Sequence, residues 1–568
     1  MCPGAESRGI INGDQLVNVM IPISKGNGNG IIELEYHHEH EEKNMRARVV
    51  DLDHDLQNEG GATTSTNVNN IKRLVLSFLH HLHQFINGLL PNLSLAEVCE
   101  ELQGMAKIAL PIIMTSMLIY SRSAISMFFL GRLGKAELAG GSLALGFGNI
   151  TGTSVLKGLS MGMDPICCQA YGAKRWSVLG QTFYKTVCLL LLVSIPISII
   201  WLNMAPILEW LGQDPEVTKV AQVYMAFSIP ELVAQAHLYP LRSFIRNQGI
   251  TAPLTISAVG SALLHLPVIH FFATYLNLGV KGVALAIGLN TINMNLGLLV
   301  YLFVSDKPVK PWKGVTILSA FQGWWPLLSL ALPSALSVCL EWWWYEIMLF
   351  LCGLLSNAQS TVAAMGILIQ TTGFLYVFPY SLSAAITTRI GHALGAGQPS
   401  RAQCTSIVGV TLAFSLGVLA FIFTISVRSV WGRLFTNETQ ILNLVTAALP
   451  ILGLCEIGNW PQTVGCGVLT GTARPYMGAR INMCAFYLIG LPVAIFAAFI
   501  YNVGFLGLWL GMLAAQISCF SMMVYTLIHT DWGNQSKRAE ELSLAGGEKE
   551  EKEDEDEDEE SGLLNSDL

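Results

Sequence analysis

Charge is scarce over most of this 568-residue chain. Aspartate, glutamate, lysine and arginine together make up 13% of the residues, about half their share in an ordinary soluble protein, and 52% of the residues are hydrophobic. The twelve cysteines lack both metal-ligand spacing and the density of a disulfide scaffold, so we interpret them as small packing residues. No phosphate-binding glycine loop follows a strand pattern, and no nucleophile, base and orienting group converge. We therefore expect neither an enzyme nor a bound metal or cofactor.

Long apolar runs are abundant instead. The hydrocarbon core of a bilayer is ~30 Å thick and needs about 20 apolar residues per helix, and lipid offers no partners to the backbone of any open structure. We predict an all-α membrane protein with twelve transmembrane helices in two groups of six. The first group comprises residues 105–129, 138–161, 186–202, 217–239, 256–276 and 282–304. The second comprises residues 325–351, 362–385, 405–425, 441–464, 481–500 and 506–528.

The distribution of basic residues predicts the orientation. Loops after even-numbered spans carry twelve lysines and arginines, whereas loops after odd-numbered spans carry six. Because positive charge is enriched in cytoplasmic loops, the even loops and both termini should face the cytosol. The first hundred residues have no apolar segment of the signal-peptide type, so the first span should serve as the targeting signal.

The chain repeats itself. Ala-Leu-Pro at 109–111 recurs at 331–333, an offset of 222, and Gly-Val-Lys-Gly at 279–282 corresponds to Gly-Phe-Leu-Gly at 504–507, an offset of 225. Three further pairs fall in the same order at offsets of 222 to 225. Six spans per repeat give both lobes the same orientation, so a pseudo-twofold axis should run along the membrane normal, as in several secondary transporters. Two such lobes can rock about a central cavity and expose it to each side in turn.

These patterns divide the chain into six regions. They are a disordered cytosolic N-tail (1–70), an amphipathic strap and entry helix (71–104), an N-terminal lobe (105–304), an inter-lobe linker (305–324), a C-terminal lobe (325–530) and an acidic, disordered cytosolic C-tail (531–568).

Two acidic residues inside spans require an explanation, because a charge at the bilayer centre costs roughly 2.5–3.5 kcal/mol on insertion scales. Glu341 lies in the middle of the seventh span with Tyr345 one turn away on the same face. Glu456 lies in the tenth span beside Asn459, where Pro461 frees a backbone carbonyl. Both are candidates for proton coupling. The alternative is that both carboxyl groups are permanently hydrogen-bonded packing elements.

Aromatic and basic residues inside the spans are further candidates. Trp342, Trp343 and Trp344 point about 100° apart from one to the next, so they cannot all face one cavity, and we assign Trp342 to it. Arg122 and Lys157 could form an intramembrane ion pair or bind an anion, or else snorkel toward the membrane surface or serve as counter-ions for a nearby acid.

The sequence resembles the multidrug and toxic compound extrusion family, and in particular its plant branch of detoxification efflux carriers. The resemblance covers residues 105–532 and rests on Phe-Leu-Gly-Arg-Leu-Gly at 129–134, on the segment from Asp164 to Lys174, on the Trp-rich segment around Glu341, on Met-Gly-Ile-Leu-Ile-Gln-Thr-Thr at 365–372 and on Pro-Gln-Thr-Val-Gly-Cys-Gly at 461–467. It implies secondary active efflux by a rocker-switch motion, in which protons are exchanged for an organic cation, a plant metabolite or a hormone.

The resemblance also implies residue roles. The family's proton-linked acids correspond to Glu341 and Glu456, and we assign the substrate cavity to Trp342, Tyr345, Asn459, Trp460 and Gln370. This chain has His392 and Ala393 where relatives often have Asn-Glu, and Thr470 where an arginine is common. All three should lie at the cytoplasmic rim, where they would affect gating or regulation.

The C-terminal tail carries a candidate sorting signal. Glu559, Leu563 and Leu564 resemble an acidic dileucine motif for clathrin-adaptor binding, which favours a vacuolar or late-endosomal membrane, with the plasma membrane as the alternative. The expected partners are protons, a small organic solute and membrane lipid, with no nucleic acid, and we expect a monomer. Two other functions stay open: a membrane-anchored trafficking protein that acts through its tails, and a lipid flippase.

Overall fold

A computed structural model describes residues 95–210, 212–312, 323–355 and 357–544, and these residues are helical almost throughout. The predicted strap, the acidic tail beyond residue 544 and the dileucine residues Glu559, Leu563 and Leu564 lie outside the described residues.

Six helical segments build the N-terminal lobe. They are α3 (Leu95–Leu133); α4 (Lys135–Gly148), η1 (Asn149–Thr153), α5 (Ser154–Met161) and α6 (Met163–Gly172) in succession; α7 (Trp176–Leu202) with the short α8 (Met204–Trp210); α9 (Pro215–Arg246); α10 (Ala252–His270) with η2 (Phe271–Tyr275); and α11 (Val280–Val304). Buried side chains of α4, α5, α7, α9 and α11 share one apolar core.

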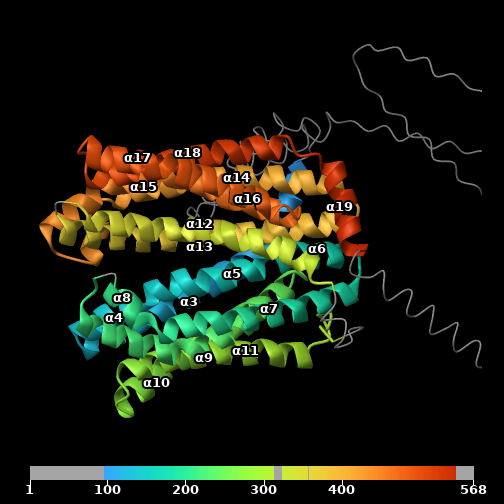
Figure 1. Cartoon of the computed structure of the whole chain (residues 1–568). Helices are drawn as coiled ribbons and strands as arrows, with labels where there is room; N and C mark the ends of the chain where they lie inside the picture. The colour runs from blue at the N-terminus through green and yellow to red at the C-terminus, as the bar shows by residue number, and fades with distance from the viewer. Residues whose placement is uncertain (1–94, 211, 313–322, 356, 545–568) are drawn as a thin grey trace, which may run out of the picture. The chain divides into compact units, whose positions relative to one another are not determined.

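Six more segments build the C-terminal lobe. They are α12 (Trp325–Gly353); α13 (Ala358–Gly395); α14 (Pro399–Val427) with the short η4 (Trp431–Leu434); α15 (Thr439–Gly471); α16 (Pro475–Asn482), η5 (Met483–Gly490), α17 (Leu491–Ile495) and η6 (Phe496–Ile500) in succession; and α18 (Phe505–Ile528). Trp344, Phe486 and Trp509 are among the large side chains buried in this lobe's core. Figure 1 shows the two sets of helices, blue to green and yellow to red.

The prediction of twelve spans is confirmed. Every predicted span lies within a helical segment, except that Leu276 follows the end of η2. Among the described residues, ten helices are long and apolar enough to cross a membrane by length and composition alone. The other two spans differ for identifiable reasons. The segment 135–172 is divided into shorter helices by η1 and by a turn at Gly162, and α9 carries several charged residues.

Irregular backbone features recur with the period of the repeat. The π-helical segments η2 and η6 begin 225 residues apart, at Phe271 and Phe496. The turns that follow them use the left-handed region at Asn277 and Gly279 in one lobe and at Asn502 and Gly504 in the other. These pairs share the 225-residue offset seen in the sequence, so the duplication extends to local backbone geometry.

The lobes approach each other most closely where glycines replace side chains. A Cβ added to Gly162 would lie 2.4 Å from the Cα of Ala331, and one added to Gly158 would lie 2.5 Å from the Cα of Ala335. Because no real Cβ packs this closely against backbone, only glycine permits α5 and α6 to contact α12 in this arrangement. By the predicted orientation, this contact lies toward the cytosolic half of the bundle.

One predicted boundary is wrong. Residues 531–568 were expected to form a disordered tail, but Trp532–Leu544 forms a helix, α19. Gln535, Ala539 and Ser543 lie four residues apart and are all buried, and α19 packs on α13, α14 and α6. Tertiary contacts therefore stabilise a segment whose polar composition alone indicates no fixed structure.

Candidate functional site

A cavity of about 500 Å³ lies between the two lobes, and we call it the central cavity. Helices α3, α5 and α9 of the N-terminal lobe and α12 and α13 of the C-terminal lobe line it. A smaller pocket of about 50 Å³, the side pocket, extends toward α15 and α16. The two share six lining residues: Lys157, Met161, Glu341, Trp342, Tyr376 and Tyr380.

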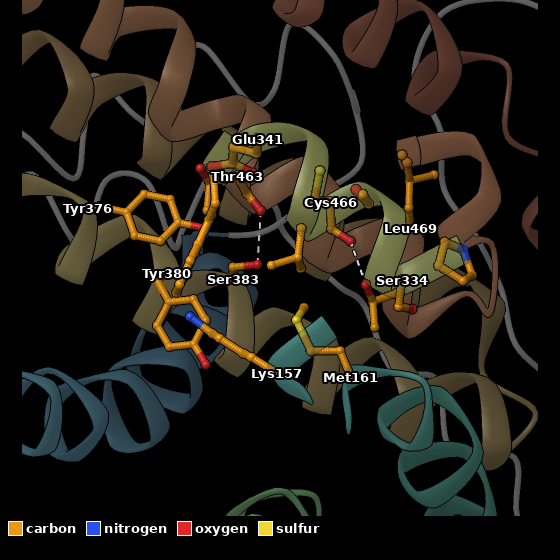
Figure 2. A pocket seen from close by; sticks show the side chains of 16 residues that line it. Lys157, Met161, Ser334, Glu341, Tyr376, Tyr380, Ser383, Thr463, Cys466 and Leu469 are labelled. Carbon is orange, nitrogen blue, oxygen red and sulfur yellow. Dashed lines mark hydrogen bonds between the residues drawn. The ribbon is translucent and has the colours of Figure 1, made fainter. Parts of the chain in front are cut away.

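Glu341 lies where the central cavity meets the side pocket. It comes from the middle of α12, and Tyr376 in α13 and Gln462 in α15 are the neighbouring polar side chains that act on its carboxyl group. Figure 2 shows Glu341 beside Tyr376 at one end of the side pocket. An acid in this position is accessible from the cavity and also borders the side pocket within the C-terminal lobe.

Lys157 of α5 is the cation whose charge acts on Glu341. Its Nζ lies 4.2 Å from the centre of the Tyr380 ring and 4.6 Å from the centre of the Trp342 ring. Figure 2 shows the ammonium against the ring of Tyr380. Since Tyr380 and Trp342 belong to the C-terminal lobe, this cation–π contact joins the two lobes.

Glu456 occupies a different environment. It is 1% exposed, and its Oε2 accepts hydrogen bonds from Asn459 Nδ2 and Trp460 Nε1, both at 3.0 Å. The charge of Glu341 acts on it, but it lines neither the central cavity nor the side pocket. The two predicted acids therefore lie near each other on α12 and α15, and only Glu341 faces the space where a solute fits.

The residues predicted for the substrate cavity separate into two groups. Trp342 and Tyr345 line the central cavity. Asn459 and Trp460 are buried and hold Glu456 instead, and Gln370 Oε1 accepts a hydrogen bond of 2.7 Å from the Tyr120 hydroxyl, across the two lobes. The three consecutive tryptophans do not all face the cavity, because Trp344 is fully buried in the core of the lobe.

Comparison with known proteins identifies the family. The MatE family profile matches residues 111–271 and 333–496, one segment in each lobe. The chain belongs to the MATE family. It is 64% identical to Protein DETOXIFICATION 53 of Arabidopsis thaliana over 80% of this chain and 93% of that protein, and 52% identical to Protein DETOXIFICATION 48 of the same plant over 79% of this chain and 84% of that one.

Solved structures agree. The crystal structure of the eukaryotic MATE transporter AtDTX14 matches with a TM-score of 0.76 and 31% identity over 79% of this chain and all of that one. A Vibrio cholerae MATE transporter, VcmN, has the same fold at 18% identity with a TM-score of 0.67, over 77% of this chain and 99% of that one. The protein is therefore a multi-pass membrane protein and a secondary efflux transporter of the MATE family, and it is not an enzyme.

Several cavity residues of this MATE protein were not predicted from the sequence. Arg242 lines the central cavity from α9, and Tyr376 and Tyr380 face it from α13 with their rings stacked at 6.0 Å. The four-residue spacing of the two tyrosines places them on one helix face, so their shared orientation could have been predicted from the sequence. Glu346 also lines the cavity, although it lies five residues beyond Glu341 on α12.

Arg122 has a clear set of partners within the N-terminal lobe. Its guanidinium lies 3.6 Å from Glu231 of α9 and donates to Thr291 Oγ1 at 3.0 Å and Asn290 Oδ1 at 3.4 Å. Of the roles considered for Arg122 from the sequence, this contact matches that of a counter-ion for a nearby acid.

The positions that depart from the MATE pattern lie where the lobes meet. His392 stacks on Tyr171 of the other lobe at 4.8 Å, and its Nε2 lies 2.6 Å from the Asn247 carbonyl oxygen. Thr470 lines the side pocket and donates to the Cys466 carbonyl at 2.9 Å.

Proposed function

We propose that this MATE transporter exchanges protons for a small organic solute by alternating access of the central cavity, with Glu341 as the proton carrier. One observation carries the proposal: Glu341 is an ionisable acid that lines both the central cavity and the side pocket, next to the cation Lys157 of the other lobe. An ionised carboxylate accepts hydrogen bonds from a solute, whereas a protonated one is a weaker acceptor. Proton and solute then compete for one group.

The packing between the lobes supports a rocking motion. Contacts at Gly158 and Gly162 bring α5 and α6 against α12 without interlocking side chains. At these two positions the helices can separate as a unit, because no large side chain there has to be withdrawn from the opposite lobe. The cavity would then open toward the side on which these glycines lie, which the distribution of basic residues assigns to the cytosol.

Glu456 has a supporting role in this proposal. The charge of Glu341 on α12 acts on it, and its own carboxyl group is fixed by Asn459 and Trp460. We assign it to proton coupling through this electrostatic interaction rather than through contact with the solute.

For the location, we propose the vacuolar or late-endosomal membrane with both termini in the cytosol. The support is the sequence of the tail, in which Glu559, Leu563 and Leu564 form an acidic dileucine pattern. A fluorescently tagged chain with Leu563→Ala and Leu564→Ala should move to the plasma membrane in plant cells. An unchanged distribution contradicts the role of the motif.

The exchange is tested with the purified full chain in proteoliposomes. Solute flux driven by an imposed pH gradient is measured for wild type, Glu341→Gln and Glu438→Gln, the last a matched change at an exposed position in the same lobe. Glu341→Gln should abolish gradient-driven flux and retain folding, and Glu438→Gln should match wild type. Undiminished flux in Glu341→Gln refutes the proposed role of this carboxyl group.

A further inference from the structure

The surroundings of Lys157 are those of a cation-binding site that is already filled. Two aromatic faces, Trp342 and Tyr380, contact its ammonium, and the carboxyl group of Glu341 acts on the same charge. Aromatic faces combined with an acid form the arrangement that recognises ammonium ligands. In this protein the ammonium comes from its own α5.

The rest of the central cavity does not favour positive charge either. Four basic side chains line it, Arg122, Lys157, Arg242 and Arg246, against two acidic ones, Glu341 and Glu346. Arg122 is paired with Glu231 at 3.6 Å, and Arg246 with Asp164 at 2.5 Å. Among the described residues, Lys157, Arg242, Glu341 and Glu346 form no ion pair, so the two unpaired bases offset the two unpaired acids and leave no excess of negative charge to attract a second cation.

Hydroxyl and amide groups make up much of the remaining polar wall. They include Ser116, Ser123, Asn149, Thr153, Gln235 and Thr372. Ser160 Oγ in the central cavity and Thr463 Oγ1 in the side pocket are buried and have no hydrogen-bond partner among the described residues. These two atoms have almost no accessible surface, so the other hydroxyl and amide groups of the wall are the ones that can bond to a solute.

We infer that Lys157 occupies the place an organic cation would take, so that the central cavity rejects organic cations and selects uncharged solutes rich in hydroxyl groups. This inference rests on the proposed function only in treating the central cavity as the solute site. Hydroxyl groups of such a solute can donate to ionised Glu341 and bond to the serine, threonine and amide groups of the wall. An aromatic part stacks against Trp342, Trp343 or Tyr345, which also line the cavity.

The test is equilibrium binding by titration calorimetry to the full-length protein in detergent, without any gradient. The probes are tetraethylammonium, a cation, and arbutin and salicin, two uncharged phenolic glucosides. Wild type should bind the glucosides and not tetraethylammonium. Lys157→Met should bind tetraethylammonium at least tenfold more tightly than wild type, while Lys157→Arg, which keeps the charge, should not.

Two results overturn the inference: wild type that binds tetraethylammonium as tightly as Lys157→Met does, or wild type that binds neither glucoside. Lys157→Gln replaces the methionine variant if that one does not fold, as judged by size-exclusion chromatography and thermal unfolding. If neither variant folds, the wild-type comparison decides, because preference for tetraethylammonium over the glucosides contradicts the inference and the reverse supports it. Since no proton gradient is used, the outcome is independent of the Glu341→Gln flux experiment.

Discussion

Lys157 Nζ, from the N-terminal lobe, lies 4.6 Å from the centre of the Trp342 ring, from the C-terminal lobe. Trp342 follows Glu341 directly on α12, so the cation of one lobe and the acid of the other meet at the same point of the cavity. Any motion that separates α5 from α12 also separates this charge from this ring. The chemistry of the cavity is thereby linked to the arrangement of the lobes.

Gly162→Ala should disrupt the packing between the lobes. The new Cβ would lie 2.4 Å from the backbone of Ala331, so α5 and α6 must move away from α12. Cys168, fully buried opposite Gly391 of the C-terminal lobe, should then react faster with N-ethylmaleimide, which peptide mass spectrometry can follow. Gly146→Ala, where the new Cβ has open space, is the matched control, and equal rates in both variants contradict the prediction.

Asp164→Ala should destabilise the N-terminal lobe. Asp164 accepts from Arg246 at 2.5 Å and from Asn247 at 2.9 Å, and both members of the ion pair are nearly buried. Removing the acid leaves a buried guanidinium uncompensated, which costs about 3–5 kcal/mol. Thermal unfolding in detergent should show a large decrease for Asp164→Ala and a smaller one for Asp164→Asn, which keeps an acceptor for Asn247. Equal stability of wild type and Asp164→Ala contradicts this.

Arg389→Lys should destabilise the protein despite keeping its charge. Arg389 binds both carboxylate oxygens of Glu101, with Nε at 2.9 Å and one terminal nitrogen at 2.7 Å, which joins α13 to the start of α3. Lysine cannot reproduce this two-point geometry, so we expect a loss of about 1.5–3 kcal/mol.

Arg401→Lys provides the control for that measurement. Arg401 pairs with the exposed Glu100 at 3.1 Å and makes one longer contact, 3.4 Å, with Glu101, but its side chain is 48% exposed, and exposed pairs contribute less than about 1 kcal/mol. Denaturant unfolding of both variants should rank Arg389→Lys clearly below Arg401→Lys. The reverse order would show that the two-point contact between Arg389 and Glu101 is not important for stability.

Glu456→Ala should be less stable than Glu456→Gln. Alanine leaves Asn459 Nδ2 and Trp460 Nε1 buried without an acceptor, at a cost of about 1–3 kcal/mol, whereas the amide oxygen of glutamine can accept from them. Thermal unfolding of the two purified variants gives the comparison. Identical midpoints would mean that these hydrogen bonds do not fix the Glu456 side chain.

Much of this fold is predictable from local sequence. Apolar runs determine the spans, and the repeated Ala-Leu-Pro places Pro111 and Pro333 at equivalent positions in α3 and α12. The contact between Trp460 and Glu456 could also be predicted from the sequence, because the two residues are four apart on one helix face. Trp460 was predicted to line the cavity, but its indole donates to this neighbour on its own helix instead.

Other features depend on contacts between distant segments. The position of Lys157 beside Trp342 follows from the register of α5 on α12, which the close packing of Gly158 on Ala335 fixes. No periodicity within either helix encodes that register. The helix Trp532–Leu544 was missed for the same reason, because its buried face exists only where α6, α13 and α14 come together.

The central claim is that Glu341 carries the proton that exchanges with solute. Its most direct test is to count the protons released when a solute that the protein transports in proteoliposomes binds to purified protein in weakly buffered solution with a pH indicator. Wild type should release protons on binding, and Glu341→Gln should bind the solute and release none. Equal proton release by wild type and Glu341→Gln would contradict the account.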